Sequence, residues 1–132
     1  MNNNKLLIVD DNKSAIKSLI RLLRHDKYQI YSANSGEEGL DILSQINVGV
    51  VISDYMMLGM NGIDFLKSVK NTRPKAVRIL FTSYADPENA INAVNHSQIF
   101  KYITKPWSPE EMKQTVRQAF KHYNLISDND RL

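Results

Sequence analysis

The residues of this chain that can do chemistry stand at the ends of apolar segments. They are Asp10, Asp11, Asp54, Thr82 and Lys105. If the apolar segments are parallel strands of one open sheet, their carboxyl ends meet at one edge, in the crevice where the strand order reverses. Packing alone explains such a convergence of polar groups poorly. The pattern therefore predicts a functional site at this edge.

Three carboxylates at one edge repel one another, and burying them without a partner is costly. An oxygen-only set of ligands suits Mg²⁺ or Mn²⁺, and the lack of cysteine and of a nearby histidine argues against zinc. Lys105 supplies a fixed positive charge and Thr82 a hydroxyl group, which suits an anionic phosphoryl group. In such a site Asp54 can act as the nucleophile and form an acyl phosphate. Taken singly, each of these residues also fits a helix cap or a turn.

Five segments rich in Val, Ile, Leu and aromatic residues are expected to be the strands. They are Lys5–Asp10, Tyr28–Ala33, Gly49–Asp54, Val77–Thr82 and Ile99–Thr104. Most are nearly continuous apolar runs, as expected of parallel strands covered on both faces. Each gap has room for one helix. The pattern predicts an α/β fold, a single (βα)5 doubly wound parallel five-stranded sheet.

The gaps carry helix start signals. A capping residue, or an acidic residue before proline, is expected at Ser35, Asn61, Asp86 and Ser108. Either Asp11 or Asn12 is expected to cap the first helix. The helix after Asp86 has a weak apolar stripe, made of Ala90, Ala93 and Val94 only. We therefore expect it to be loosely held.

Composition narrows the class of protein. The chain has 132 residues, 42% of them hydrophobic, no cysteine and a formal charge of +3. This predicts one domain without disulfides, and the absence of a signal peptide or a long apolar run predicts a soluble, cytoplasmic protein. The basic residues Lys113, Arg117 and Lys121 recur every four residues, as on the solvated face of a helix. We therefore expect no direct binding of nucleic acid and no membrane partner.

Five motifs appear in order between residues 5 and 124. They are Leu6-Leu7-Ile8-Val9-Asp10-Asp11, Val51-Ile52-Ser53-Asp54-Tyr55-Met56-Met57, Met60-Asn61-Gly62, Ile79-Leu80-Phe81-Thr82-Ser83 and Tyr102-Ile103-Thr104-Lys105-Pro106. Together they resemble the receiver domain of bacterial two-component response regulators, in particular its chemotaxis-regulator-like form. The resemblance implies the flavodoxin-like receiver fold with strand order 2-1-3-4-5. It also implies a receiver domain over residues 1–124, followed by a short polar tail, or the start of a linker, at 125–132.

The resemblance implies a role for each acidic residue. Asp54 would accept a phosphoryl group from the phosphohistidine of a sensor histidine kinase or a phosphotransfer protein. Asp11 would bind Mg²⁺ directly and Asp10 mainly through water. Asp54 and the backbone carbonyl of Met56 would complete the metal ligands. The chain would then be a regulatory phosphoacceptor that catalyses only its own phosphorylation and dephosphorylation.

The resemblance also implies how the signal leaves the site. Lys105, Thr82 and Ser83 would contact the phosphoryl oxygens, and the bond between Lys105 and Pro106 would be cis. Thr82 and Tyr102 would form a switch that alters the face made by the helix after Asp86, the strand at 99–104 and the helix after Ser108. That face would signal to an output domain or a downstream protein. It is also where a homodimer would form.

The chain departs from the common receiver pattern at several positions. Leu58 stands where many receivers have proline. Met56 and Tyr84 are bulky where many relatives carry polar groups that position water, which leads to the hypothesis that they slow hydrolysis of the aspartyl phosphate. Trp107, after Lys105-Pro106, resembles receivers attached to larger output modules, some with cyclic-dinucleotide phosphodiesterase domains.

Three alternatives stay open on the sequence. A small phosphatase or phosphotransferase of the haloacid-dehalogenase type shares the nucleophile, metal and lysine, but it usually has a second acid where this chain has Met56. A flavin-binding electron carrier shares the fold class, but Asp10-Asp11-Asn12 would repel a phosphate. A degenerate receiver that is never phosphorylated would act as a binding module.

Overall fold

The computed structural model describes residues 3–82 and 99–130. Its five strands are β1 (Lys5–Val9), β2 (Gln29–Ala33), β3 (Val50–Asp54), β4 (Val77–Thr82) and β5 (Lys101–Thr104). They form one sheet in the order β2-β1-β3-β4-β5, and every neighbouring pair is parallel. This confirms the predicted parallel sheet and its strand order.

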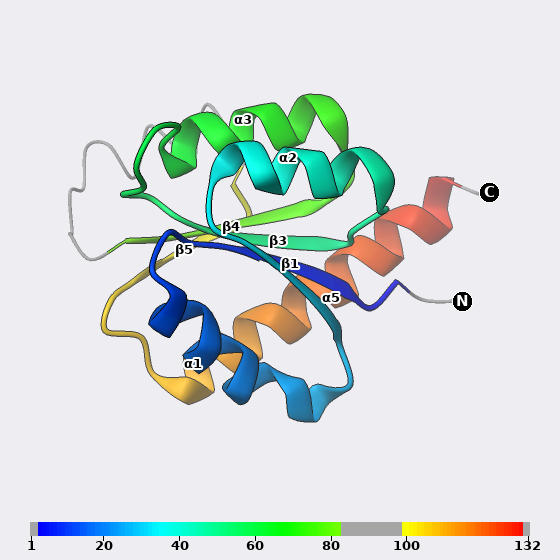
Figure 1. Cartoon of the computed structure of the whole chain (residues 1–132). Coiled ribbons are helices and arrows are strands. Elements are labelled where there is room, and N and C mark those ends of the chain that lie inside the picture. Colours follow the sequence, from blue (N-terminus) through cyan, green and yellow to red (C-terminus); the bar gives the residue numbers. More distant parts are fainter. Residues whose placement is uncertain (1–2, 83–98, 131–132) are drawn as a thin grey trace.

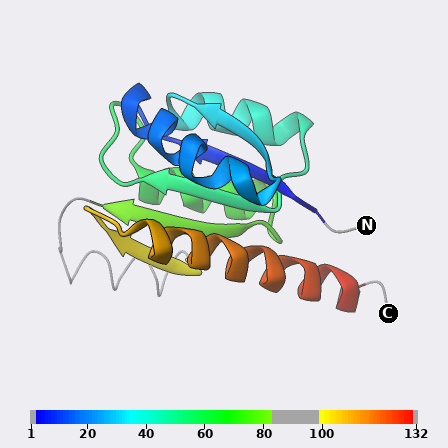
Figure 2. The ribbon, with the colours of Figure 1, turned by 90° about the horizontal axis from the view of Figure 1, so that it is seen from below.

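Helices cover both faces of the sheet. They are α1 (Lys13–Leu23), α2 (Gly36–Gln45), α3 (Gly62–Thr72) and α5 (Pro109–Asp130), and a short 3₁₀ turn, η1 (Arg24–Asp26), follows α1. Helices α2 and α3 lie on one face, and α1 and α5 lie on the other (Figures 1 and 2). The helix expected after Asp86, with its weak apolar stripe, lies outside the described residues.

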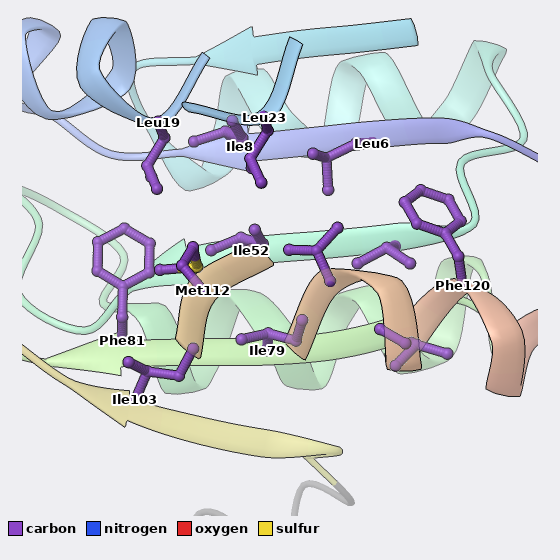
Figure 3. Close-up of a cluster of buried hydrophobic side chains, with 14 of the residues drawn as sticks. Leu6, Ile8, Leu19, Leu23, Ile52, Ile79, Phe81, Ile103, Met112 and Phe120 are labelled. Carbon is purple, nitrogen blue, oxygen red and sulfur yellow. The ribbon is translucent and has the colours of Figure 1, made fainter. Parts of the chain in front are cut away.

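Alternate residues along each central strand enter two separate cores. Leu6 and Ile8 of β1 pack into the core beneath α1 and α5, which Figure 3 shows, together with Leu19 and Met112. Leu7 of β1 packs into the core beneath α2 and α3. The period of two along a strand produces this division. It explains why β1, β3 and β4 are nearly continuous apolar runs.

The two edge strands are less buried than the sequence suggests. In β2 only Ala33 is buried, and in β5 only Ile103 is buried. An edge strand has a neighbour on one side only, so its remaining residues reach solvent. Tyr102 of β5 is consequently 38% exposed.

Helix caps form where the sequence places them in the part of the chain that the structure describes, which leaves out the expected start at Asp86. The Asn12 side chain accepts hydrogen bonds from the N–H groups of Ser14 and Ala15. Ser35, Asn61 and Ser108 likewise accept from the amide three residues ahead, at 3.1, 2.9 and 2.9 Å. Asn12 and not Asp11 therefore caps α1, which leaves the Asp11 carboxylate available for the acidic site.

Helix α5 extends further than expected. The sequence placed the end of the folded domain at Asn124 and a polar tail after it, but α5 continues to Asp130. The segment from Leu125 to Asp130 has neither glycine nor proline to end a helix. Leu125 is 57% exposed and Ile126 is 37% exposed, so these apolar residues lie on a solvent-facing part of the helix.

Among the residues that the structure describes, no helix combines the length and the apolar character needed to span a bilayer.

Candidate functional site

An acidic cluster forms at the carboxyl ends of β1 and β3. Asp10 and Asp11 follow β1, and Asp54 is the last residue of β3. The two strands are hydrogen-bonded neighbours, with Val9 opposite Ser53. One carboxylate oxygen from each of the three aspartates lies within 4.8 Å of the others. The edge at which they meet lies opposite the two chain ends (Figure 1).

Lys105 reaches into this cluster from the end of β5. Its Nζ lies 3.4 Å from Asp54 Oδ1 and 3.8 Å from Asp10 Oδ2. The same nitrogen lies 4.7 Å from the centre of the Phe81 ring, a cation–π distance. The Lys105 N–H donates to the carbonyl oxygen of Thr82 at 2.7 Å, and the Lys105–Pro106 bond is cis. Backbone and side chain together therefore hold the ammonium group beside the carboxylates.

Burial makes the two inner carboxylates harder to ionise. Asp10 is fully buried, and burial, with a smaller contribution from nearby Asp54, raises its pKa to about 6. The Asn12 N–H and Lys105 oppose this rise. Burial also raises the pKa of Asp54, and the nearby Lys105 opposes it. Both acids would be stabilised as carboxylates by additional positive charge.

Each aspartate has one oxygen fixed by a backbone amide. Asp10 Oδ1, Asp54 Oδ1 and Asp11 Oδ2 accept, each at 2.9 Å, from the N–H groups of Asn12, Tyr55 and Leu58 respectively. Within the described residues, the buried Asp10 Oδ2 has no hydrogen-bond partner. An orphaned buried carboxylate oxygen in an oxygen-only cluster fits a hard divalent cation such as Mg²⁺ or Mn²⁺.

Gly62 has a structural part in the site that the sequence reasoning missed. Its N–H donates to the carbonyl oxygen of Tyr55 at 2.8 Å. A Cβ at this position would overlap the carbonyl oxygen of Asp54 and lie 2.9 Å from Tyr55 Cα. Only glycine lets the first turn of α3 lie so close to the end of β3. The Asn61-Gly62 pair was the available signal: it was interpreted as a helix start and as part of the receiver motif Met60-Asn61-Gly62, but not as a close backbone contact.

The remaining candidate residues lie at different distances from the cluster along the sheet. Thr82 is 3% exposed and ends β4 opposite Thr104 of β5. Tyr102 lies earlier in β5, opposite Leu80, and is partly exposed. The Met56 side chain, two residues after Asp54, is 59% exposed. The structure therefore brings Asp10, Asp11, Asp54 and Lys105 together, with Thr82 on the strand that lies between β3 and β5.

Ser83 and Tyr84 lie outside the described residues. The phosphoryl contact expected of Ser83 and the effect of Tyr84 on hydrolysis therefore stay predictions. Trp107 is partly buried and packs against the core beneath α1 and α5.

Comparison with known families gives a match over most of the chain. The family model described as "Response regulator receiver domain" matches residues 6–117.

Curated relatives have similar sequences but are longer. The hydrogenase transcriptional regulatory protein HoxA of Cupriavidus necator is 36% identical over 127 residues, which are 96% of this chain and 26% of the relative. The regulatory protein AtoC of Escherichia coli is 31% identical, over 88% of this chain and 25% of the relative. This chain thus spans about a quarter of the length of these two relatives.

Solved structures share the fold over nearly the whole chain. The signal receiver domain of an HD domain-containing protein from Pseudomonas fluorescens is 29% identical with a TM-score of 0.90, covering 100% of this chain and 96% of that one. A response regulator receiver domain from Clostridium thermocellum is also 29% identical, with a TM-score of 0.86, covering 92% of this chain and 98% of that one.

Proposed function

This chain belongs to the response regulator receiver domain family, and from that premise we propose that Asp54 accepts a phosphoryl group from a phosphohistidine. The donor would be a sensor histidine kinase or a histidine phosphotransfer protein. The phosphorylated domain would then signal to an output domain or a separate protein. The chain would act as a regulatory phosphoacceptor whose only chemistry is its own phosphorylation and dephosphorylation.

The observation that carries the proposal is the position of Lys105. Its Nζ lies 3.4 Å from Asp54 Oδ1 and 3.8 Å from Asp10 Oδ2. A phosphoryl group on Asp54 brings negative charge to this place, and a fixed cation there stabilises the charge as it develops. Asp54 ends β3 at this edge of the sheet and keeps 8% of its surface exposed.

The proposed reaction is a direct transfer. A carboxylate oxygen of Asp54 attacks phosphorus, the P–N bond to the donor histidine breaks, and the departing imidazole nitrogen takes up a proton. Tyr55 N–H and Lys105 both contact Asp54 Oδ1. Oδ2 makes no hydrogen bond within the described residues, so it is the oxygen that we expect to attack.

A divalent cation fits this reaction. Asp10, Asp11, Asp54 and the backbone carbonyl of Met56 would hold Mg²⁺ or Mn²⁺, which would neutralise charge on the phosphoryl oxygens. Lys105 would then orient the phosphoryl group from the end of β5, two strands away from β3 in the sheet. The Asn12 amide keeps Asp10 directed into the cluster, because it fixes Asp10 Oδ1 at 2.9 Å.

The signal would pass from the phosphorylation site through β4 and β5. Thr82 and Ser83 would contact the phosphoryl oxygens, and Tyr102 would turn inward as Thr82 moves. Tyr102 starts from a partly exposed position on the edge strand β5, which leaves it free to change conformation. The altered face, made by the segment after Asp86 with β5 and α5, would meet an output domain, a partner protein or a second copy of the chain.

The length and names of the relatives support the proposal that the domain controls a separate output part. HoxA and AtoC are named as regulatory proteins, and each is about four times as long as the matched part. We therefore expect a receiver of this kind to control a separate output part and to act in the cytoplasm, without contacting nucleic acid itself.

The test is phosphorylation by a small donor. The chain is incubated with Mg²⁺ and acetyl phosphate, and its intact mass is measured. We expect the addition of one phosphoryl group, lost in Asp54→Ala and kept in Asp64→Ala, which changes an exposed aspartate in the first turn of α3. Turnover of many phosphate esters would instead favour the phosphatase alternative. No adduct under any condition would favour the degenerate receiver.

A further inference from the structure

Leu58 contributes to the site through its backbone alone. Its N–H donates to Asp11 Oδ2 at 2.9 Å, whereas its side chain is 84% exposed. The bond joins the segment that follows β3 to the residue that follows β1. The chemical character of the Leu58 side chain therefore has little bearing on this contact.

Asp11 needs such a contact more than its two neighbours do. Asp10 and Asp54 are buried, and Lys105 lies within 4 Å of both. Asp11 is exposed and has no described ion pair, yet one of its oxygens lies within 4.8 Å of the other two carboxylates. Repulsion between like charges favours its rotation into solvent. Within the described part of the chain, the Leu58 N–H is the donor that holds the Asp11 carboxylate in the cluster.

We propose that the Leu58 N–H is a positioning group for the divalent cation: it keeps Asp11 in place before the cation binds and while it is bound. The inference rests on the proposed function, because it takes Asp11 to be a metal ligand. The hydrogen bond goes to Oδ2, which leaves Oδ1 for coordination. Loss of a hydrogen bond to a ligating carboxylate typically lowers metal affinity about 10- to 100-fold.

The local backbone makes this idea testable with a matched pair of variants. The next residue, Gly59, has φ of +79°, the conformation that a type II turn requires after its first central residue. Proline is favoured at that first central position. Proline at position 58 is therefore compatible with the conformation of Gly59, and Leu58→Pro removes the N–H together with the exposed side chain. Leu58→Ala removes the side chain and keeps the N–H.

The main experiment is a Mg²⁺ titration of the metal-free chain, followed by Trp107 fluorescence and by backbone amide chemical shifts. We expect Leu58→Ala to bind Mg²⁺ as the wild type does and Leu58→Pro to bind about 10-fold more weakly. Equal affinity of Leu58→Pro and wild type overturns the inference and leaves the proposed function intact. Equal weakening in both variants also overturns it, because the side chain would then be responsible. A wild type that binds no Mg²⁺ overturns both this inference and the metal part of the proposed function.

A second measurement does not depend on the folding of Leu58→Pro. Hydrogen exchange of the Leu58 amide is compared in the wild type and in Asp11→Ala, with the Gly59 amide as an internal reference. We expect exchange at Leu58 to be slow in the wild type, to stay slow with saturating Mg²⁺, and to accelerate in Asp11→Ala. Unchanged exchange in Asp11→Ala, or loss of protection when Mg²⁺ binds, would contradict a positioning role.

Discussion

Gly62 lies against the backbone of Asp54 so closely that a Cβ would overlap the Asp54 carbonyl oxygen and come within 2.8 Å of its carbonyl carbon. The Gly62 N–H also donates to the carbonyl oxygen of Tyr55 at 2.8 Å. The first turn of α3 thus fixes the position of the proposed phosphoacceptor. No side chain of α3 is needed for this, because both contacts involve backbone atoms.

Gly62→Ala should therefore damage both stability and the site. Backbone atoms cannot move aside as a flexible side chain can, so we expect a loss of about 1–3 kcal/mol in the free energy of unfolding. We also expect slower phosphorylation of the remaining folded protein. Chemical denaturation and the rate of adduct formation with acetyl phosphate measure the two effects.

Gly49→Ala is the matched control for this change. A Cβ at Gly49 would meet side-chain atoms of Asn3 and Phe120 at 3.0–3.3 Å, and Asn3 can shift. Gly49 precedes β3 and Asp54 ends it, so the control lies at the other end of the strand. A phosphorylation rate in Gly62→Ala equal to that of Gly49→Ala would mean that Gly62 does not position Asp54.

The sequence predicts the acidic site well because the site depends on strand ends. Once the five apolar segments are recognised, parallel pairing alone brings Asp10, Asp11 and Asp54 to one edge. Lys105 follows from the same rule, since β5 ends at Thr104. Residue type and position in the strand are both visible in a sequence.

The contacts of Gly62 and Leu58 could not be predicted in the same way. The Leu58 contact is made by a backbone N–H group, which every residue but proline has, so residue type hardly reveals it. The Gly62 contact requires glycine, but a glycine after asparagine also fits an ordinary helix start, so the close approach to Asp54 becomes visible only in three dimensions.

The continuation of α5 to Asp130 was not predicted either. The polar segment after Asn124 suggested a tail, but a helix that packs on the core as far as Tyr123 can continue beyond it into solvent.

Asp10 should make the metal-free protein less stable as the pH rises. Its pKa is about 6 when folded and near 3.8 when unfolded, so the folded state binds the proton more tightly. The contribution of Asp10 is therefore most favourable below pH 4 and is lost as the pH rises through about 6, by up to about 3 kcal/mol. The raised pKa of Asp54 acts in the same direction.

Asp10→Asn removes the ionisation and keeps the shape of the side chain. In EDTA we expect this variant to be more stable than the wild type at pH 7.5, with the difference shrinking towards pH 4. Urea denaturation at several pH values measures it. A wild type that is the more stable of the two at pH 7.5 would contradict the assignment of a destabilising buried charge to Asp10.

Lys105 offsets part of the destabilisation that the buried, ionised Asp10 causes. The Lys105 side chain is 25% exposed, so its ion pairs with Asp10 and Asp54 are intermediate between a surface pair and a fully buried one. A surface ion pair contributes up to about 1 kcal/mol to the free energy of unfolding, and breaking a fully buried pair costs about 3–5 kcal/mol. We expect Lys105→Met to lose about 1–3 kcal/mol at pH 7.5 without metal. Lys101→Met, on the exposed part of the same strand, should stay within about 0.5 kcal/mol of the wild type.

Mg²⁺ should stabilise the folded chain, and more at pH 7.5 than at pH 5. Below about pH 6 a proton on Asp10 competes with the cation. At pH 7.5, a concentration of about 100 times the dissociation constant should add about 2.7 kcal/mol. Thermal unfolding measures the shift, which should vanish in Asp11→Ala and persist in Asp64→Ala. An equal shift at both pH values would show that the cation does not bind beside Asp10.

Met56 should lengthen the lifetime of the phosphorylated state. Its side chain is 59% exposed and stands two residues after Asp54, where it would cover the path of an attacking water and offers no group to orient that water. Met56→Asn supplies such a group, so we expect dephosphorylation to accelerate on the order of 10-fold, below the 10²–10⁴ of full proton-transfer catalysis. Phosphorylated Met56→Leu, which keeps the bulk of the side chain and adds no polar group, should lose its phosphoryl group at the wild-type rate.

The decay of the mass adduct after removal of acetyl phosphate gives both dephosphorylation rates. Adding Tyr84→Glu to Met56→Asn should increase the rate further. Equal decay in Met56→Asn and Met56→Leu would place the control of hydrolysis elsewhere in the chain.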